Sequence, residues 1–328
     1  MLKLILLVAA APIFLIFVIL VFLFRHKLAK TEQRDVEKAA AAKAEEEEEL
    51  STFEGGEDLT VDEILEAPGE VIGKSKYGTL YKASLQRSQR TRVLRFLRPA
   101  AATEESGDDT VGFLGSIRHP NLVPMLGFYA GRRGEKLLVH PFYGRGNLAD
   151  FITVGEAEAE SERWEIIYKI SMGIAKALDH LHSELQKPLA HGNLKSKNIL
   201  LDRNFEPHVS DFGLHLLLNP AANQELLRVS ADSGYKAPEL IKMTDADERT
   251  DVYSYGKILL ELLLYGKDQP SNRNSPPDGD GGDCGVSDDR ILRCSRIVEA
   301  CCSSSPDLRP NFKEVIAKIE EIGRIKID

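Results

Sequence analysis

The 328-residue sequence contains little cysteine, and its four cysteines are confined to the C-terminal part, at positions 284, 294, 301 and 302. No C-x-x-C pair and no His/Cys spacing typical of a zinc site is present. We therefore expect neither a disulfide framework nor a zinc centre. Cys301 and Cys302 are interpreted as small residues on a helix in a reducing compartment.

The sequence also lacks an excess of basic residues, with 42 Lys and Arg against 51 Asp and Glu and a net charge of -9. This charge is unevenly distributed: the segment from Thr31 to Glu66 contains 14 acidic and 3 basic residues, a local net charge of -11. The remainder of the chain is close to neutral. This balance argues against nucleic acid as a partner.

A single long hydrophobic run is present, from Leu4 to Phe24, and it contains no charged residue. As a helix it would be about 31 Å long, which matches the hydrocarbon core of a bilayer. The small residues at 8–10 leave a cleaved signal peptide as an alternative, but the run continues well past them. Arg25, Lys27 and Lys30 follow the run, so the positive-inside rule predicts a single-pass anchor with nearly all of the chain in the cytoplasm.

An acidic juxtamembrane linker is predicted over residues 25–58. The part from Thr31 to Leu50 is rich in Ala, Glu and Lys, and it would form either a solvated helix or a disordered spacer. Its charge should be repelled by an anionic inner leaflet. The glycines at 55 and 56 indicate a flexible entry to the folded part, which is expected to begin at Leu59.

The hydrophobic periodicity changes along the folded part. Short strand-like runs come first, at Glu70–Ile72, Thr79–Ser84 and Thr91–Leu97. Beyond Gly146 the pattern is helical, and residues 162–185 place one apolar face every three to four positions. This order predicts an α+β protein with a β-rich lobe, a helical lobe and a cleft between them.

Five motifs follow one another at characteristic spacings: GKSKYG (73–78), HGNLKSKNILLD (191–202) with DFG (211–213), SGYKAPE (233–239), DVYSYG (251–256) and DLRP (307–310). By these motifs the chain resembles the protein kinase family over residues 59–325, most closely the plant leucine-rich-repeat receptor-like kinases. The resemblance implies a bilobal kinase fold, here preceded by one transmembrane helix (1–24). No leucine-rich repeat is present, which fits either a truncated gene model or a relative without an ectodomain.

The resemblance also implies a site for ATP with Mg²⁺. The residues expected to contact the nucleotide are Gly73, Gly78, Leu80, Val93, Arg95, Pro141, Tyr143 and Leu200. Asn198 and Asp211 occupy the positions of the metal ligands, and Lys195 would face the γ-phosphate. His140 stands at the gatekeeper position, where it is expected to narrow the back of the pocket.

Several positions depart from the family pattern. Arg95 replaces a lysine that grips phosphates, Thr110 stands where its glutamate partner belongs, and Ser75 replaces a loop glycine. Gly192 replaces an arginine that would bind a phosphorylated activation segment, so phosphate on Ser230 or Ser233 would find no partner there. A Gly/Pro/Ser/Asp-rich tract at Asp268–Asp289 replaces a substrate-docking helix.

Asn193 replaces the acid that handles the substrate proton, and an amide cannot accept that proton. Positions that hold the fold are kept, including Asp251 and a predicted buried pair of Glu239 with Arg309. We therefore predict a plasma-membrane pseudokinase that binds ATP weakly and regulates receptor-like kinases or other signalling proteins in the same membrane. The alternative is a weak Ser/Thr kinase that uses Asn193 for orientation and Arg95, Lys74 or Lys76 for phosphate contact.

Overall fold

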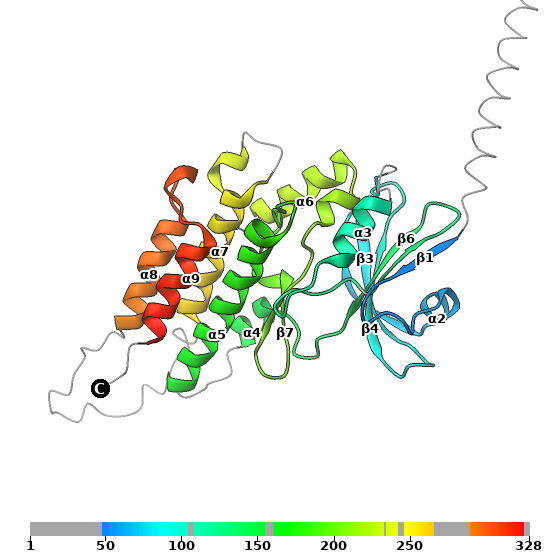
Figure 1. Ribbon diagram of the computed structural model, residues 1–328, viewed down its shortest axis with the longest axis horizontal. Helices are drawn as coiled ribbons and strands as arrows, with labels where there is room; N and C mark the ends of the chain where they lie inside the picture. Colours follow the sequence, from blue (N-terminus) through cyan, green and yellow to red (C-terminus); the bar gives the residue numbers. More distant parts are fainter. Residues whose placement is uncertain are drawn as a thin grey trace, which may run out of the picture. The chain divides into compact units, whose positions relative to one another are not determined.

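The computed structural model describes residues 48–103, 108–154, 160–232, 234–241, 246–265 and 289–324 (Figure 1). The predicted membrane span Leu4–Phe24 lies outside these residues, as do residues 25–47 of the predicted linker and nearly all of the Asp268–Asp289 tract. Within the described ranges, no helix is long and apolar enough to cross a bilayer.

The chain divides into two compact units. The smaller comprises Met1–Glu49 and Ala130–Glu135; in its described part a turn is closed by the Gly131 amide, which donates to the Glu135 carbonyl over 2.8 Å. The larger unit comprises Leu50–Tyr129 and Lys136–Asp328 and contains nearly all the elements described below.

A six-stranded sheet has the strand order β1-β5-β6-β4-β3-β2. Its strands are β1 (Glu49–Thr52), β2 (Gly69–Lys74), β3 (Gly78–Ser84), β4 (Thr91–Leu97), β5 (Gly127–Ala130) and β6 (Lys136–Pro141). The three strands predicted from the alternating pattern therefore correspond to β2, β3 and β4. Strand β1 precedes Leu59, so the sheet includes residues from the segment that was expected to be linker.

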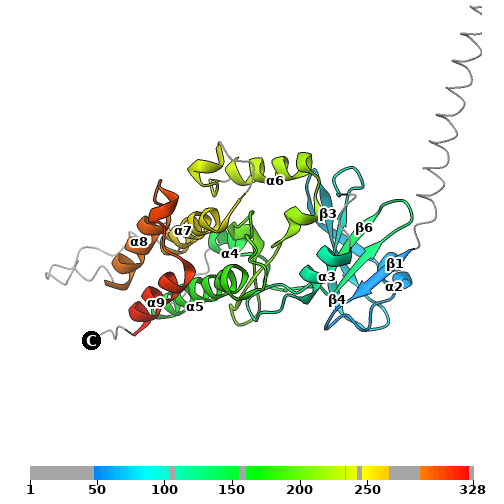
Figure 2. The ribbon, with the colours of Figure 1, turned by 45° about the horizontal axis from the view of Figure 1, so that its top comes forward.

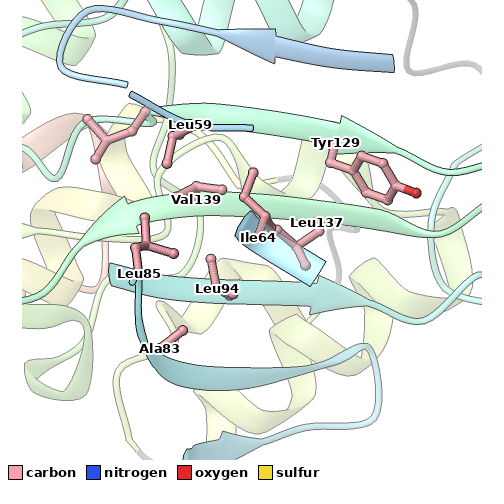
Figure 3. Packing of buried hydrophobic residues seen from close by; sticks show 9 residues of the cluster. Leu59, Ile64, Ala83, Leu85, Leu94, Tyr129, Leu137 and Val139 are labelled. Carbon is pink, nitrogen blue, oxygen red and sulfur yellow. The ribbon is translucent and has the colours of Figure 1, made fainter. Parts of the chain in front are cut away.

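One face of this sheet carries a hydrophobic core (Figure 3). The helix α2 (Val61–Glu66) covers that face with Ile64, and Thr60 caps the helix by accepting from the Glu63 amide at 3.3 Å. Leu94 of β4 and Val139 of β6 are register partners and lie in the same cluster. Because side chains alternate along a strand, the neighbours of Leu94 along β4 and of Val139 along β6 project to the opposite face of the sheet.

The helical part is built around α5 (Glu160–Asp179), whose Ile167, Ile170, Ile174 and Leu178 are almost fully buried. It continues into a short π-helix (His180–Glu184) and packs against α7 (Glu248–Leu264) and α9 (Phe312–Gly323). The remaining elements are α3 (Asp108–Ser116), α4 (Leu148–Val154), α8 (Asp289–Cys301) and a two-stranded sheet of β7 (Ile199–Leu201) and β8 (Pro207–Val209).

Local sequence signals account for the ends of these helices. Asp247 caps α7 and forms a reciprocal capping box with Thr250, and Asn311 does the same with Glu314 at α9. Cys301 is fully buried on α8, as expected for a small structural residue. Burial raises the pKa of its thiol to about 12, so it is unreactive.

A helix that the sequence analysis did not predict follows the DFG motif. After a 3₁₀ turn at Leu214–Leu217, the chain forms α6 (Pro220–Asp232). Asn219 caps it by accepting from the Ala222 amide at 2.9 Å, and Ala222, Leu226 and Leu227 form its buried stripe. Both views show α6 extending from the β3 side of the sheet toward α7 (Figure 2).

Candidate functional site

The loop His191–Asn198 is held in place by one carboxylate from α7. Asp251 accepts hydrogen bonds from the amides of His191 (2.6 Å) and Gly192 (3.0 Å), and His182 lies 2.9 Å away. Burial acts to raise the pKa of Asp251, but the hydrogen bond to His182, the electrostatic effect of His182 and His191 and the hydrogen bond from the Gly192 amide lower it overall. The carboxylate therefore stays ionised and fixes the backbone of the loop.

Asn193 sits inside this loop with its side chain buried, at 1% exposure. Its backbone is bonded: the amide donates to His191 Nδ1 at 3.2 Å, and the carbonyl accepts from Asn198 Nδ2 at 2.9 Å. Neither Oδ1 nor Nδ2 of its side chain has a hydrogen-bond partner among the described residues. A buried amide left this way is destabilising.

Gly192 adopts a left-handed backbone conformation with φ of 75°. A Cβ atom there would lie 3.4 Å from Ala246 Cβ and 3.6 Å from His215 Nδ1. The space is tolerable, but the conformation disfavours any residue with a side chain. An arginine at this position would therefore be strained in the present loop.

Arg95 and Asp211 form an ion pair between Nη2 and Oδ1. Both side chains are largely buried, at 8% and 11% exposure. Arg95 comes from the middle of β4, opposite Leu80 of β3 and Leu138 of β6. Asp211 has a left-handed backbone with φ of 67°, which aspartate tolerates better than most residues.

Tyr77, in the glycine-rich loop between β2 and β3, closes over this pair with only 9% of its surface exposed. Burial raises the pKa of its hydroxyl, the charge of Asp211 raises it further, and hydrogen bonds to Arg95 and Ser75 oppose this rise. Ser75 Oγ in turn accepts from the Gly78 amide at 3.0 Å. The serine that replaces the middle glycine thus ties the loop to itself.

A small cavity of about 30 Å³ lies behind the ion pair. Its lining includes Arg95, Asp211, His140, Met125, Leu114 and Phe212. This volume holds about one water molecule. His140 is kept neutral there, because burial lowers its pKa to about 4, and its Nδ1 lies 3.0 Å from the Pro124 carbonyl.

The segment after Asp211 is bonded to the loop that follows β4. The Asn219 amide donates to the Ala101 carbonyl at 2.9 Å, and the Thr103 amide donates to Leu217 at 3.1 Å. In α6, Glu225 lies 3.1 Å from Lys76 Nζ of the glycine-rich loop. Hydrogen bonds from Arg228 and Lys76 lower the pKa of Glu225 to about 2, so this contact is ionic at neutral pH.

A family model described as protein tyrosine and serine/threonine kinase matches residues 67–319. The chain belongs to the protein kinase family. Among relatives, the kinase-like protein TMKL1 of Arabidopsis thaliana is 34% identical over 88% of this chain and 46% of its own length. The A. thaliana protein named "Probable inactive receptor kinase At4g23740" is 31% identical over 91% of this chain and 49% of its own. The chain thus spans about half the length of these relatives.

Two solved structures are similar to the chain. The kinase domain of maize SIRK1 (sucrose-induced receptor kinase 1), bound to AMP-PNP, has a TM-score of 0.68 and 26% identity, and the match covers 84% of this chain and all of that one. The pseudokinase domain of BIR2, an immune regulator of the RLK/Pelle family, has a TM-score of 0.58 and 27% identity, with coverage of 77% and 80%. The resemblance to plant receptor-like kinases and the bilobal kinase fold are confirmed.

Within the kinase fold, three of the eight residues predicted to contact nucleotide lie on one face of the sheet. Leu80 and Arg95 are register partners, and Val93 lies two residues before Arg95, so all three project from the face opposite the α2 core. Val93 pairs with His140, and Arg92 pairs with Pro141. The gatekeeper His140 and the predicted nucleotide contact Pro141 therefore lie together at the end of β6, beside the start of β4. Leu80 and Val93 are half-buried.

The remaining predicted residues border that face. Gly78 requires its glycine, because a Cβ there would lie 2.6 Å from the Phe96 carbonyl oxygen, whereas at Gly73 it would lie 3.2 Å from Leu80 Cδ1. Tyr143 stacks on His208 with ring centroids 4.2 Å apart, and Leu200 forms a β-bridge with Asn147. Burial lowers the pKa of Lys195, the nearby cations lower it further, and Asp211 opposes them.

The sequence analysis missed Tyr77, helix α6 and the contact of Lys76 with Glu225. The signals for α6 were present: Asn219 and Pro220 are an N-cap and a first-turn residue, and Ala222, Leu226 and Leu227 have helical spacing. The burial of Tyr77 had no local signal, because Asp211, which influences its hydroxyl, is distant in sequence. Thr110, predicted where a glutamate partner of Arg95 would stand, lies on α3, and the carboxylate bonded to Arg95 comes from Asp211 instead.

The fit of ATP and of Mg²⁺ to these residues differs. The sheet face with Leu80 and Val93 offers half-buried apolar side chains to an adenine ring. The metal site is less suitable, because the Asp211 carboxylate is already paired with Arg95. Asn198 donates to the Asn193 carbonyl through Nδ2, so its Oδ1 remains the atom that could bind a metal ion. Among the described residues no cluster of three His, Cys, Asp or Glu is arranged to hold a metal ion.

Proposed function

We propose that this chain is a membrane-tethered receptor-like pseudokinase that acts as a scaffold or allosteric regulator in receptor kinase signalling. The observation that carries the proposal is the pairing of Arg95 with Asp211, together with the buried amide at position 193, Asn193. The Asp211 carboxylate, which is expected to bind metal, is paired with the Arg95 guanidinium. The position that accepts the substrate proton in the family is occupied by the buried amide of Asn193. Relatives named as inactive receptor kinases support the same conclusion.

Phosphotransfer is the direct test of this proposal. The full-length protein in detergent, incubated with Mg-ATP and general protein substrates, should incorporate no more phosphate than the Asp211→Asn variant. A signal that disappears in Asp211→Asn would refute the pseudokinase assignment. Contaminating kinases are excluded by this comparison, because they would contribute equally to both preparations.

The second candidate is a weak Ser/Thr kinase. It is favoured by the bond of 2.9 Å between Asn198 and the Asn193 carbonyl, which keeps the loop geometry, and by the retention of Lys195. In this case Asn193 would orient a hydroxyl without accepting its proton, with a loss of about 10²–10⁴-fold in rate. An Asp211-dependent signal that also requires Lys195 would select this candidate.

Weak ATP binding is part of the proposal. The sheet face with Leu80 and Val93 supports adenine binding, and the related SIRK1 domain was solved with AMP-PNP. Loss of the metal contact should weaken affinity by a few kcal/mol, which moves a micromolar affinity toward the millimolar range. Tenfold saturation would then stabilise the fold by about 1.4 kcal/mol, a shift of a few degrees in melting temperature.

For location, we propose a single pass at Leu4–Phe24 in the plasma membrane, an acidic linker over 25–58 and a cytoplasmic kinase-like domain over 59–325. The relatives named as receptor-like kinases support this. Full-length protein should resist extraction by alkaline carbonate, and a C-terminal epitope should be digested in vesicles whose cytoplasmic face is outward. Extraction by carbonate would refute the anchor.

The proposed partners are receptor-like kinases in the same membrane. An active receptor-like kinase reconstituted with this chain in vesicles should change its autophosphorylation rate, whereas the same chain added to separate vesicles should have no effect. If the rate is the same in both arrangements, the chain has no regulatory effect on that kinase.

A further inference from the structure

The Arg95–Asp211 pair brings together a cation and the carboxylate expected to bind metal. The two are 116 positions apart in sequence, and both side chains are at least 89% buried, at 8% and 11% exposure. The pair is therefore shielded from solvent screening, and the charge-assisted bond is strong. Tyr77 of the glycine-rich loop is buried, and it lies close enough to Arg95 and Asp211 for both to shift the pKa of its hydroxyl.

The positive charges around Asp211 already outweigh its single negative charge without a metal ion. Arg95 contacts its carboxylate, and the Lys195 ammonium is close enough for Asp211 to affect its pKa. At Asn193, where the family has a second acid, the side chain is a neutral amide. A divalent cation would thus enter a site with one carboxylate and two cations, whereas Mg²⁺ is normally held by carboxylates together with phosphates.

Metal binding would also require the ion pair to open. Arg95 cannot lose its proton, so releasing Asp211 would leave a buried guanidinium without its carboxylate. Removing one partner of a buried pair is strongly unfavourable, and it would weaken metal affinity on the order of a hundredfold or more.

We propose that the Arg95 guanidinium takes the place of the divalent cation at this site, so that a nucleotide bound here is held without Mg²⁺. This inference rests on the proposed weak ATP binding. A guanidinium has five donors in a planar fork, so it can bond Asp211 and a phosphate oxygen together. A phosphate would displace the Tyr77 hydroxyl from Arg95, which keeps the affinity low.

The first test compares ATP affinity of the full-length protein in Mg²⁺ and in EDTA, measured by thermal shift and isothermal titration. The dissociation constant should agree within about twofold between the two conditions. Binding about tenfold or more tighter with Mg²⁺ would overturn the inference. Arg95→Lys is the matched variant: its shorter point charge should release Asp211 in part and make binding depend on Mg²⁺.

The second test uses Mn²⁺ alone, detected by electron paramagnetic resonance, and needs no nucleotide. Wild-type protein should bind no more Mn²⁺ than Asp211→Asn. Arg95→Met should gain a Mn²⁺ site that Arg95→Met/Asp211→Asn lacks; Arg95→Gln replaces it if Arg95→Met does not fold.

The two tests separate the two proposals. If ATP binds in neither condition, the weak-nucleotide proposal fails, and the Mn²⁺ measurements still decide the role of Arg95. Asp211-dependent Mn²⁺ binding to the wild type, or no gain in a folded Arg95 variant, would refute that role.

Discussion

Arg309 and Arg95 each bury a guanidinium against a carboxylate, one in the helical part of the molecule and one at the candidate site. Arg309 contacts Glu239 through both terminal nitrogens, at 2.5 and 2.8 Å, and also bonds two backbone carbonyls. Arg95 contacts Asp211 through one terminal nitrogen, and it lies close enough to the Tyr77 hydroxyl to lower the pKa of that group.

Two polar side chains at the loop His191–Asn198 differ in a similar way. Asp251 is bonded by His182 and by two loop amides. The Asn193 side-chain amide is buried without a partner among the described residues. The Asp251 carboxylate thus stabilises the loop through hydrogen bonds, whereas the Asn193 side chain contributes none to it.

The largest effect is expected from breaking the Arg309 pair. Arg309→Ala leaves Glu239 without its cation and two carbonyls without a donor, so unfolding should become easier by about 3–5 kcal/mol. Chemical denaturation of the protein in detergent measures this. Arg324→Ala, which breaks an exposed contact of 3.7 Å with Glu320, should leave stability unchanged. Equal changes in the free energy of unfolding for the two variants would show that the buried Arg309 pair contributes no more to stability than the exposed Arg324 pair.

The two buried asparagines of the loop offer a matched pair. Asn198→Leu removes the bond to the Asn193 carbonyl and should destabilise by about 1–3 kcal/mol. Asn193→Leu replaces an amide whose polar atoms have no partner, so the free energy of unfolding should stay the same or rise. Thermal denaturation of both variants tests this. A loss at Asn193 as large as that at Asn198 would mean that its amide is bonded in solution.

A pH dependence should arise at the gatekeeper. Burial lowers the pKa of His140 to about 4 from an ordinary value near 6.5, so the unfolded chain binds the extra proton first. Stability contributed by neutral His140 is therefore complete above about pH 6.5 and is lost as pH falls toward 4, by at most about 1.4 kcal/mol per pH unit.

Replacing this histidine should flatten the pH profile. His140→Leu cannot take up a proton, so its stability should fall less steeply than that of the wild type between pH 6.5 and 5. Burial also lowers the pKa of His191, which acts in the same direction, so some slope should remain. If the free energy of unfolding depends on pH equally in both proteins, protonation of His140 does not destabilise the fold, and the prediction is wrong.

The smallest effect is expected at the contact of Lys76 with Glu225. The Lys76 side chain is 72% exposed, so the pair should be screened by salt and add little to global stability. Lys76→Ala should instead speed hydrogen exchange of the amides in the glycine-rich loop without moving the melting temperature. Lys74→Ala, in the same loop, is the control. Equal exchange in both variants would show that α6 does not hold the loop.

The sequence by itself determined the kinase family, the succession of a strand-rich part and a helical part, and the pair of Glu239 with Arg309. These features follow from alternation, helical spacing, capping residues and motif order, all of which are local or are matched to the family. The degenerate positions Asn193, Gly192 and Arg95 were also identifiable, because each replaces one residue within a recognisable motif.

Only the tertiary structure decided what those positions do. Arg95 was expected to face phosphate, yet folding brings it against Asp211, because burial makes any nearby carboxylate its best partner. In the same way, Tyr77 lies near Asp211, and Lys76 of the glycine-rich loop contacts Glu225 of α6, although the members of each pair are more than a hundred residues apart in sequence. Side-chain partners at long sequence separation depend on packing, and no local pattern in the sequence encodes that choice.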